Sequence, residues 1–144
     1  MTDQVAFHLM GEPLVHPLFN KFVEICDRKG LKINLVSNGI LLRENRMTYL
    51  LHRALRQVNF SLHSFRDNFP EKDPTEYLDK IFKFTEMAYV SRPELYINFR
   101  LWNLKEVKGL APWNTDFLER IAHRFGVVAP TEYDLKYKKS IRLK

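Results

Sequence analysis

Cysteine is almost absent from this sequence, and its scarcity limits the chemistry that the chain can carry. The 144 residues include a single cysteine, Cys26. A disulfide needs two thiols, and cysteine-ligated zinc or iron–sulfur sites need several thiolates. The chain alone therefore cannot form an intrachain disulfide or hold a cysteine-ligated cluster, and any cluster chemistry must come from residues outside it.

Long hydrophobic runs are missing as well. No stretch approaches the roughly 20 consecutive apolar residues of a membrane span, and the polar residues 1–4 lack the basic and apolar regions of a signal peptide. With 45% hydrophobic and 28% charged residues, the composition is that of a soluble globular protein. We expect one cytoplasmic domain over residues 1–144, with no membrane partner.

The positive charge is concentrated at one end. The formal net charge is +6, yet residues 136–144 hold five basic residues and no acidic one. The rest of the chain is therefore close to neutral, and residues 137–144 are interpreted as a short basic tail. We expect no nucleic-acid partner. The alternative is a nucleic-acid binder whose salt-dependent interaction would vanish on deletion of residues 136–144.

Short strand-like runs alternate with amphipathic helical stretches. The expected strands cover residues 5–10, 31–35, 58–62, 96–102, and 127 onward, resuming at 133–137. The expected helices cover residues 17–29, 44–56, 75–89 and 114–125. Four βα repeats and a final strand predict an α/β fold with five parallel strands, four helices and right-handed crossovers over residues 5–137. An open twisted sheet and an arc of a barrel both satisfy this pattern.

Alternation along the expected strands separates an apolar face from a polar face. The apolar set, which should pack beneath the helices, is Phe7, Leu9, Leu31, Ile33, Leu35, Val58, Phe60, Leu62, Ile97, Phe99 and Leu101. The polar set is His8, Met10, Glu12, Asn34, Asn38, Asn59, Ser61, His63, Tyr96, Asn98 and Arg100. Unpartnered polar groups are costly to bury, about 1 to 3 kcal/mol each, so this face should be wet or occupied by a ligand.

The polar side chains gather toward the carboxyl ends of the strands, where parallel α/β folds bind ligands. An anionic or zwitterionic small molecule is the natural ligand for such an edge. A solvent-facing sheet that carries polar residues on its open side is the simpler alternative, but it leaves the composition of the turns unexplained.

Three turns follow the strands. In residues 8–13, Gly11 lets the backbone approach a ligand and Glu12 adds an acceptor, which together suit an ammonium group. Residues 37–39 read Ser-Asn-Gly. The hydroxyls and the imidazole of residues 61–64 suit the hydroxyl groups of a sugar.

Each of the three turns closes a βα unit. Their order along the chain resembles that of the radical S-adenosylmethionine (radical SAM) superfamily, and the resemblance extends over nearly the whole chain. Residues 8–13 look like its Gly-Glu motif, residues 37–39 like its Thr-Asn-Gly turn, and residues 61–64 like its ribose-side segment. Residues 98–102 and 127 onward would be its fifth and sixth strands. The resemblance implies an arc of a six-stranded partial TIM-like barrel.

The resemblance also implies roles for residues at the first two turns. Met10, Gly11 and Glu12 would receive the amino group of the methionyl moiety of S-adenosylmethionine, with Glu12 accepting from it. Asn38 would border the pocket.

The remaining implied contacts lie on the later strands. Ser61 and His63 would face the ribose. Arg100 would bind the carboxylate of the cofactor through charge-assisted hydrogen bonds. An ion pair on the polar face, or a contact with the substrate, is an equal alternative for Arg100.

The chain departs from the family at its start. Family members hold a [4Fe–4S] cluster with CxxxCxxC, and that cluster cleaves S-adenosylmethionine to a 5′-deoxyadenosyl radical, which abstracts hydrogen from the substrate. No such segment occurs here, and Cys26 lies on the apolar face of its helix, as a small buried hydrophobic residue would. We expect a fragment of such an enzyme, without the cluster and inactive alone.

The parent enzyme would need an electron donor and a substrate that the sequence leaves open, a peptide or a protein among the options. The chain should self-associate through exposed strand edges. The alternative function is a non-enzymatic α/β module that binds a nucleotide-like ligand. A CxxxCxxC segment encoded upstream of Met1 would favour the enzyme, and its absence would favour the module.

Overall fold

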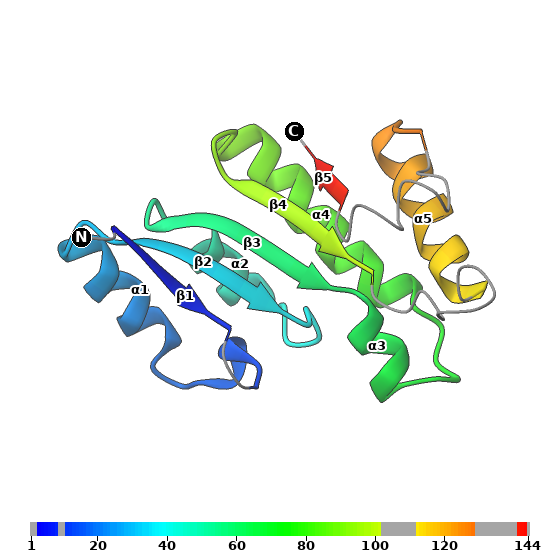
Figure 1. The fold of residues 1–144 in the computed structure, drawn as a ribbon, viewed down its shortest axis with the longest axis horizontal. Coiled ribbons are helices and arrows are strands. Elements are labelled where there is room, and N and C mark those ends of the chain that lie inside the picture. The colour runs from blue at the N-terminus through cyan, green and yellow to red at the C-terminus, as the bar shows by residue number, and fades with distance from the viewer. Residues whose placement is uncertain (1–2, 9–10, 102–111, 129–140, 144) are drawn as a thin grey trace.

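The structure, a computed structural model, describes residues 3–8, 11–101, 112–128 and 141–143 (Figure 1). Within these ranges no helix has the length and apolar composition that crossing a membrane requires. The strands are β1 (Gln4–Phe7), β2 (Lys32–Ser37), β3 (Leu55–Ser61), β4 (Tyr96–Arg100) and β5 (Ile141–Leu143). The helices are the 3-10 turn η1 (Pro13–Val15), α1 (Phe19–Arg28), α2 (Glu44–Leu50), α3 (His63–Asn68), α4 (Thr75–Ser91) and α5 (Pro112–Phe125).

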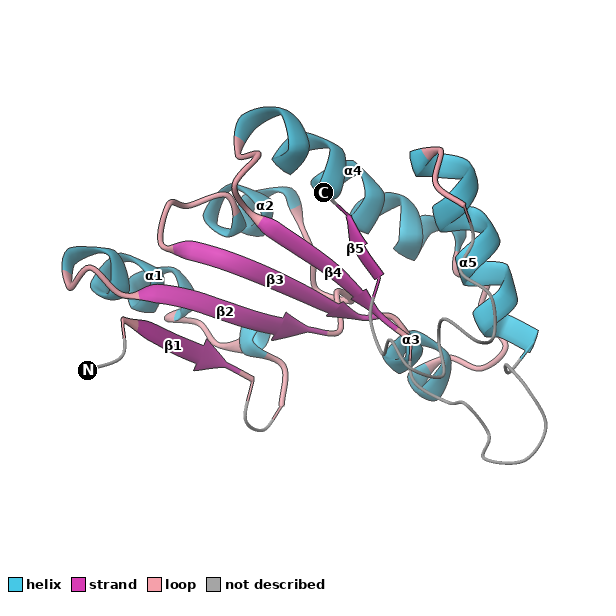
Figure 2. Cartoon of the chain, turned by 45° about the horizontal axis from the view of Figure 1, so that its top comes forward, coloured by secondary structure: helices cyan, strands magenta, loops and turns pink. Residues whose placement is uncertain are grey.

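One sheet contains all five strands in the order β1-β2-β3-β4-β5. Strands β1 to β4 are parallel, which confirms the predicted α/β fold with parallel βα repeats. Each crossover advances by one strand in the same direction, so right-handed connections place the helices on one face of the sheet. Figure 2 shows α2 and α4 together behind the sheet. Helices on one face only are typical of an arc of a barrel. They exclude a doubly wound sheet, in which helices cover both faces.

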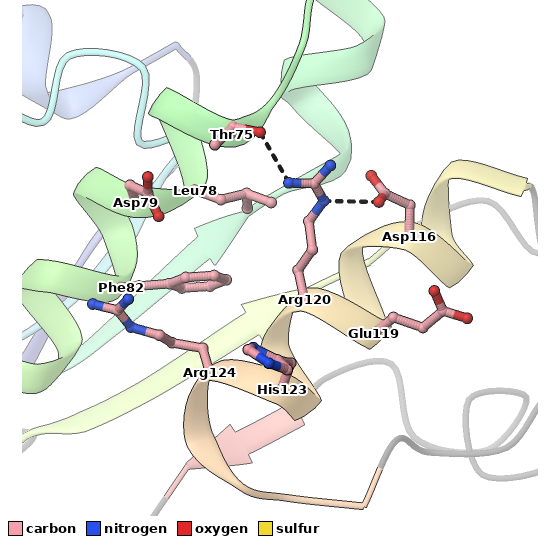
Figure 3. A pocket seen from close by; sticks show the side chains of 9 residues that line it. All are labelled: Thr75, Leu78, Asp79, Phe82, Asp116, Glu119, Arg120, His123 and Arg124. Atoms are coloured by element: carbon pink, nitrogen blue, oxygen red, sulfur yellow. Dashed lines mark hydrogen bonds and ion pairs between the residues drawn. The ribbon is translucent and has the colours of Figure 1, made fainter.

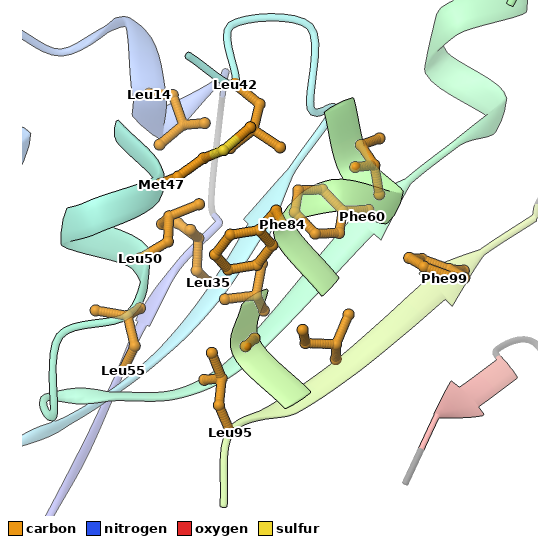
Figure 4. Close-up of a cluster of buried hydrophobic side chains, with 14 of the residues drawn as sticks. Leu14, Leu35, Leu42, Met47, Leu50, Leu55, Phe60, Phe84, Leu95 and Phe99 are labelled. Atoms are coloured by element: carbon orange, nitrogen blue, oxygen red, sulfur yellow. The ribbon is translucent and has the colours of Figure 1, made fainter. Parts of the chain in front are cut away.

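The core lies between the sheet and its helices. Of the strand residues predicted to face the helices, Ile33, Leu35, Val58, Phe60 and Phe99 are fully buried. Figure 4 shows Leu35, Phe60 and Phe99 among side chains of α2 and α4. The predicted apolar face is therefore confirmed on β2, β3 and β4. Each fully buried aliphatic or aromatic side chain contributes about 1.5 to 3 kcal/mol relative to exposure.

Helix α4 begins where its sequence predicts. The backbone N–H of Thr75 donates to Oδ1 of Asp73 at 2.7 Å, as an N-cap residue requires. Hydrogen bonds from the side chain of Thr75 and from its backbone N–H lower the pKa of the Asp73 carboxyl. Glu76, in the first turn of α4, pairs with Lys80 one turn along the exposed face.

The fifth strand of the described residues differs from the prediction: it does not begin at Val127, and it runs antiparallel to β4. Val127 and Val128 lie outside any strand, and residues 129–140 lie outside the described residues. The N–H of Val127 donates to the carbonyl of Ala122 at 3.2 Å, which closes the end of α5 and removes that donor from any ladder. Instead, β5 at Ile141–Leu143 pairs antiparallel with β4. It takes up part of the segment interpreted as a basic tail.

Three further boundaries differ from the prediction. Helix α2 ends at Leu50 and a turn leads into β3 at Leu55, so the apolar run through Leu55 is divided between two elements. Strand β1 ends at Phe7. The short helix α3 was missed, because its segment reads as a polar loop and its one buried side chain, Phe65, provides no periodic apolar pattern.

Gly39 allows α4 to dock closely on the turn after β2. Its φ is +72°, and a Cβ built there would lie 2.8 Å from Cδ1 of Ile81 and 3.3 Å from Phe60. Gly39→Ala should lower the free energy of unfolding by about 2 to 4 kcal/mol, because strain and overpacking add. Gly30→Ala is the matched control, since Gly30 has φ +67° with open space around its Cβ position, and it should cost about 1 kcal/mol. Urea unfolding measures both, and equal losses would contradict the close packing.

Candidate functional site

The ends of the four parallel strands meet at one edge of the sheet. The register pairs Ser37 of β2 with Phe60 of β3, and Ser61 of β3 with Arg100 of β4. Glu12 enters the same edge from the turn after β1, because it hydrogen-bonds residues at the end of β2. The structure therefore brings together the predicted residues of the strand ends, except Met10, which lies outside the described residues.

Glu12 joins the turns after β1 and β2. Its Oε1 accepts from the backbone N–H of Leu14 at 3.0 Å and from the hydroxyl of Ser37 at 2.8 Å. Its Oε2 accepts from the backbone N–H of Asn38 at 2.6 Å. A carboxylate has about four acceptor positions, and donors from the described residues fill three of them, which leaves one on Oε2 within this part of the chain. Next to it, Gly11 is exposed.

Three polar groups of Asn38 are hydrogen-bonded: its backbone N–H, its side-chain Oδ1 and its carbonyl. Besides the bond from its N–H to Glu12, its Oδ1 accepts from the backbone N–H of Ile40 at 2.9 Å, and its carbonyl accepts from the hydroxyl of Tyr77 at 2.7 Å. Asn38 is half-buried and follows the last residue of β2 at this edge. Its amide side chain, however, is used to shape its own turn.

Tyr77 was missed as a site residue. The sequence places it on the apolar face of α4, and it is indeed buried there. A buried tyrosine hydroxyl requires a hydrogen-bond partner, and this requirement is the only signal in the sequence that Tyr77 reaches a polar group. The partner itself, the carbonyl of Asn38, is 39 residues away.

Ser61 and His63 lie beside the end of β4. Both are half-buried, and the N–H of the intervening Leu62 donates to the carbonyl of Arg100 at 3.0 Å. His63 begins α3. Burial lowers the pKa of its imidazole, and the positive charge of Arg100 adds to this, whereas the Arg100 carbonyl and Asp67 act in the opposite direction. His63 is thus held neutral, a state in which one ring nitrogen donates and the other accepts.

Arg100 carries the positive charge of this edge. It is half-buried, and no carboxylate of the described residues lies within ion-pair distance of it. The alternative of an ion pair on the polar face is therefore absent from this part of the chain. A guanidinium placed in this way suits a carboxylate ligand.

The polar face is satisfied internally in the middle of the sheet. Oδ1 of Asn59 accepts from Gln57 at 2.8 Å and from Asn98 at 3.0 Å, and Nδ2 of Asn59 donates to the carbonyl of Leu35. Asn59 and Asn98 are buried. The expectation that this whole face is wet or occupied is wrong for these residues, because amides on neighbouring strands satisfy one another. Only the strand ends remain for a ligand.

Cys26 lies in the core on α1, and burial raises the pKa of its thiol. It is the small buried hydrophobic residue that the sequence predicts and is unsuited to bind iron as a thiolate. Within the described ranges no group of three His, Cys, Asp or Glu side chains could hold a metal ion.

A cavity of about 350 Å³ lies between α4 and α5 (Figure 3). The guanidinium of Arg120 crosses it, bonded to Asp116 at 2.7 Å and to the hydroxyl of Thr75 at 2.9 Å. These charged side chains pair with one another, and none of the predicted site residues lines the cavity.

The partial burial of His63 predicts a pH-dependent stability. Because folding holds the imidazole neutral, protonation favours the unfolded chain. The stabilisation by neutral His63 is complete above the ordinary pKa of 6.5 and is lost as the pH falls through the lower folded pKa. The difference in unfolding free energy between the wild type and His63→Gln should therefore shrink from pH 7.5 to pH 5. Urea unfolding at several pH values measures it, with the exposed His123→Gln as control. A difference that grows on acidification would contradict the burial.

Comparison with known proteins finds similarity to solved structures only. No protein-family model and no curated protein matches the chain. A structure of TYW1 with a lysine-pyruvate adduct bound aligns with a TM-score of 0.42 and 20% identity over 73% of this chain and 43% of that one. A crystal structure of archaeal TYW1 aligns with a TM-score of 0.44 and 15% identity over 92% of this chain and 54% of that one. The chain spans about half the length of these proteins. At such low similarity, its function has to be inferred from the chemistry of the strand ends.

Proposed function

We propose that this chain forms part of the S-adenosylmethionine-binding wall of a radical SAM enzyme. The observation that carries the proposal is the pair of opposite charges at one sheet edge. Among the described residues, three donors bind Glu12 at the end of β2 and leave one acceptor position on it, and Arg100 at the end of β4 has no carboxylate partner. The order of the three turns, which resembles that of the radical SAM superfamily, supports the same function.

The distance between the ends of β2 and β4 suits the methionyl group of S-adenosylmethionine. Strands β2 and β4 are two strand spacings apart, about 10 Å. An α-amino acid group with a hydrogen bond of about 2.8 Å at each end covers nearly this span, and the arginine side chain covers the remainder. In this arrangement Oε2 of Glu12 accepts from the ammonium group, and Arg100 donates to the carboxylate.

The other residues of the edge fit the ribose. Ser61 pairs in register with Arg100, and neutral His63 follows it on α3, so a hydroxyl and an imidazole lie beside the carboxylate-binding end. Gly11 and Met10 would contribute backbone carbonyls near the ammonium group, and Asn38 would border the pocket on the side of Glu12.

Bound S-adenosylmethionine would supply, after reduction by a [4Fe–4S] cluster held outside this chain, the radical that abstracts hydrogen from a substrate. Residues of this chain would orient the cofactor and neutralise its charges. The substrate, whether a peptide, a protein or another molecule, and the electron donor would be provided by the parent enzyme.

A non-enzymatic module is the second candidate function. The three internal donors on Glu12 favour it, because they make the carboxylate a structural link that a ligand-free protein would also need. Such a module would bind a nucleotide-like ligand at the same edge. An anaerobic iron and sulfide assay on an N-terminally extended chain distinguishes the two functions.

Arg100→Gln tests the proposed cofactor contact. Loss of a charge-assisted hydrogen bond should weaken S-adenosylmethionine binding to the chain about 10- to 100-fold, measured by titration calorimetry. Ser61→Ala should weaken it less. Arg56→Gln is the matched control, since exposed Arg56 lies near the opposite end of β3 and should leave the affinity unchanged. Equal affinity in the wild type and in Arg100→Gln would remove Arg100 from the site.

We also propose that the chain self-associates along β1, which pairs only with β2 among the described strands. The neighbouring side chains Val15, Leu18 and Phe22 are 64%, 49% and 38% exposed. Leu18→Lys should raise the dimer dissociation constant about tenfold or more, because it removes apolar area from the contact. Val90→Lys, at an exposed position on α4, is the control. Sedimentation velocity measures both, and a wild type that stays monomeric at millimolar concentration would contradict the association.

A further inference from the structure

Tyr77 of α4 contacts both halves of the candidate site. On one side its hydroxyl donates to the carbonyl of Asn38 at 2.7 Å. On the other side its ring stacks on Phe65 of α3, with a centroid distance of 4.4 Å and an interplanar angle of 18°. Asn38 belongs to the Glu12 half of the site, and α3 begins with His63. One side chain therefore links the turn after β2 to the helix after β3.

Glu12 and Tyr77 hold the two peptide groups that flank Asn38. The N–H before its Cα donates to Glu12, and the carbonyl after it accepts from Tyr77. These two bonds come from different elements, the turn after β1 and helix α4. With both peptide groups held, the turn after β2 cannot rotate without breaking at least one of the bonds.

The packing of α4 supports the same contact. One turn after Tyr77, Ile81 packs against Gly39, where a Cβ would lie within 2.8 Å of it. Residues four apart lie on one face of a helix, so Tyr77 and Ile81 approach the turn after β2 together. Burial raises the pKa of the Tyr77 hydroxyl above its ordinary value, and the negative charge of Glu12 adds to this. The hydroxyl therefore remains a donor at neutral pH.

We propose that Tyr77 is a positioning residue for the strand-end site, fixing the turn of Asn38 relative to His63 so that the two halves keep one geometry. Its effect on a ligand rests on the proposed function. Its effect on the protein does not, because the hydrogen bond and the ring stack join only residues of this chain.

Tyr77→Phe removes the hydroxyl and keeps the ring stack with Phe65. The amide hydrogens of Asn38 and Gly39 should exchange about tenfold faster in the variant, in line with the loss of one hydrogen bond. The amide chemical shift of His63 should change as well. Tyr89→Phe, 69% exposed on the same helix, is the matched control and should leave all three signals as in the wild type.

The affinity for S-adenosylmethionine, measured at a temperature at which every variant is folded, provides the second readout. It should fall about tenfold in Tyr77→Phe and stay unchanged in Tyr89→Phe. Tyr77→Phe combined with Glu12→Gln should weaken binding less than the product of the single effects, because both residues hold Asn38.

The two proposals fail in different ways. If the wild type does not bind S-adenosylmethionine, the proposed function fails, while amide exchange still tests the positioning. If Tyr77→Phe equals Tyr89→Phe in exchange, chemical shift and affinity, the positioning role is overturned. Should Tyr77→Phe not fold, the wild type decides: a slowly exchanging Tyr77 hydroxyl proton close to Asn38 supports the role, and its rapid exchange with solvent overturns it.

Discussion

The candidate site depends on the hydrogen bonds that the Glu12 carboxylate accepts. Its three hydrogen bonds connect the turn after β1 to the turn after β2. Among the described residues, backbone pairing joins these strands up to Phe7 and Leu35, and beyond that point the Glu12 side chain connects the two segments. A charged acceptor is well suited to this task, because hydrogen bonds to an ionised group are shorter and stronger than neutral ones.

The winding of the sheet determines which of its faces is available to a ligand. Each parallel crossover moves on by one strand, so the helices cover one face and the apolar residues of β2, β3 and β4 gather beneath them. The opposite face is polar, but its middle is closed by the amides of Gln57, Asn59 and Asn98. Ligand chemistry is consequently left to the carboxyl ends of the strands.

Much of the fold follows from local signals. The alternation of apolar residues predicts β2, β3 and β4. Asp73 and the apolar residues at helical spacing after it predict α4. Both signals arise because an element that buries one face carries apolar residues at its own structural period. Two elements were not predictable in this way. Val127 and Val128 have strand-forming side chains, yet the N–H of Val127 closes a helix. Helix α3 buries too few residues to produce a period.

The sequence by itself determined the parallel α/β class, the apolar face and the gathering of polar residues at the strand ends, since each depends on residue type and local spacing. Only the tertiary structure decided that the Glu12 carboxylate connects two turns while keeping a position at the proposed ligand site. It also decided that the Tyr77 hydroxyl bonds the carbonyl of Asn38, 39 residues away. Hydrogen bonds between distant segments depend on how those segments pack. The sequence shows that a buried polar side chain needs a hydrogen-bond partner, but which group becomes that partner depends on the folded structure.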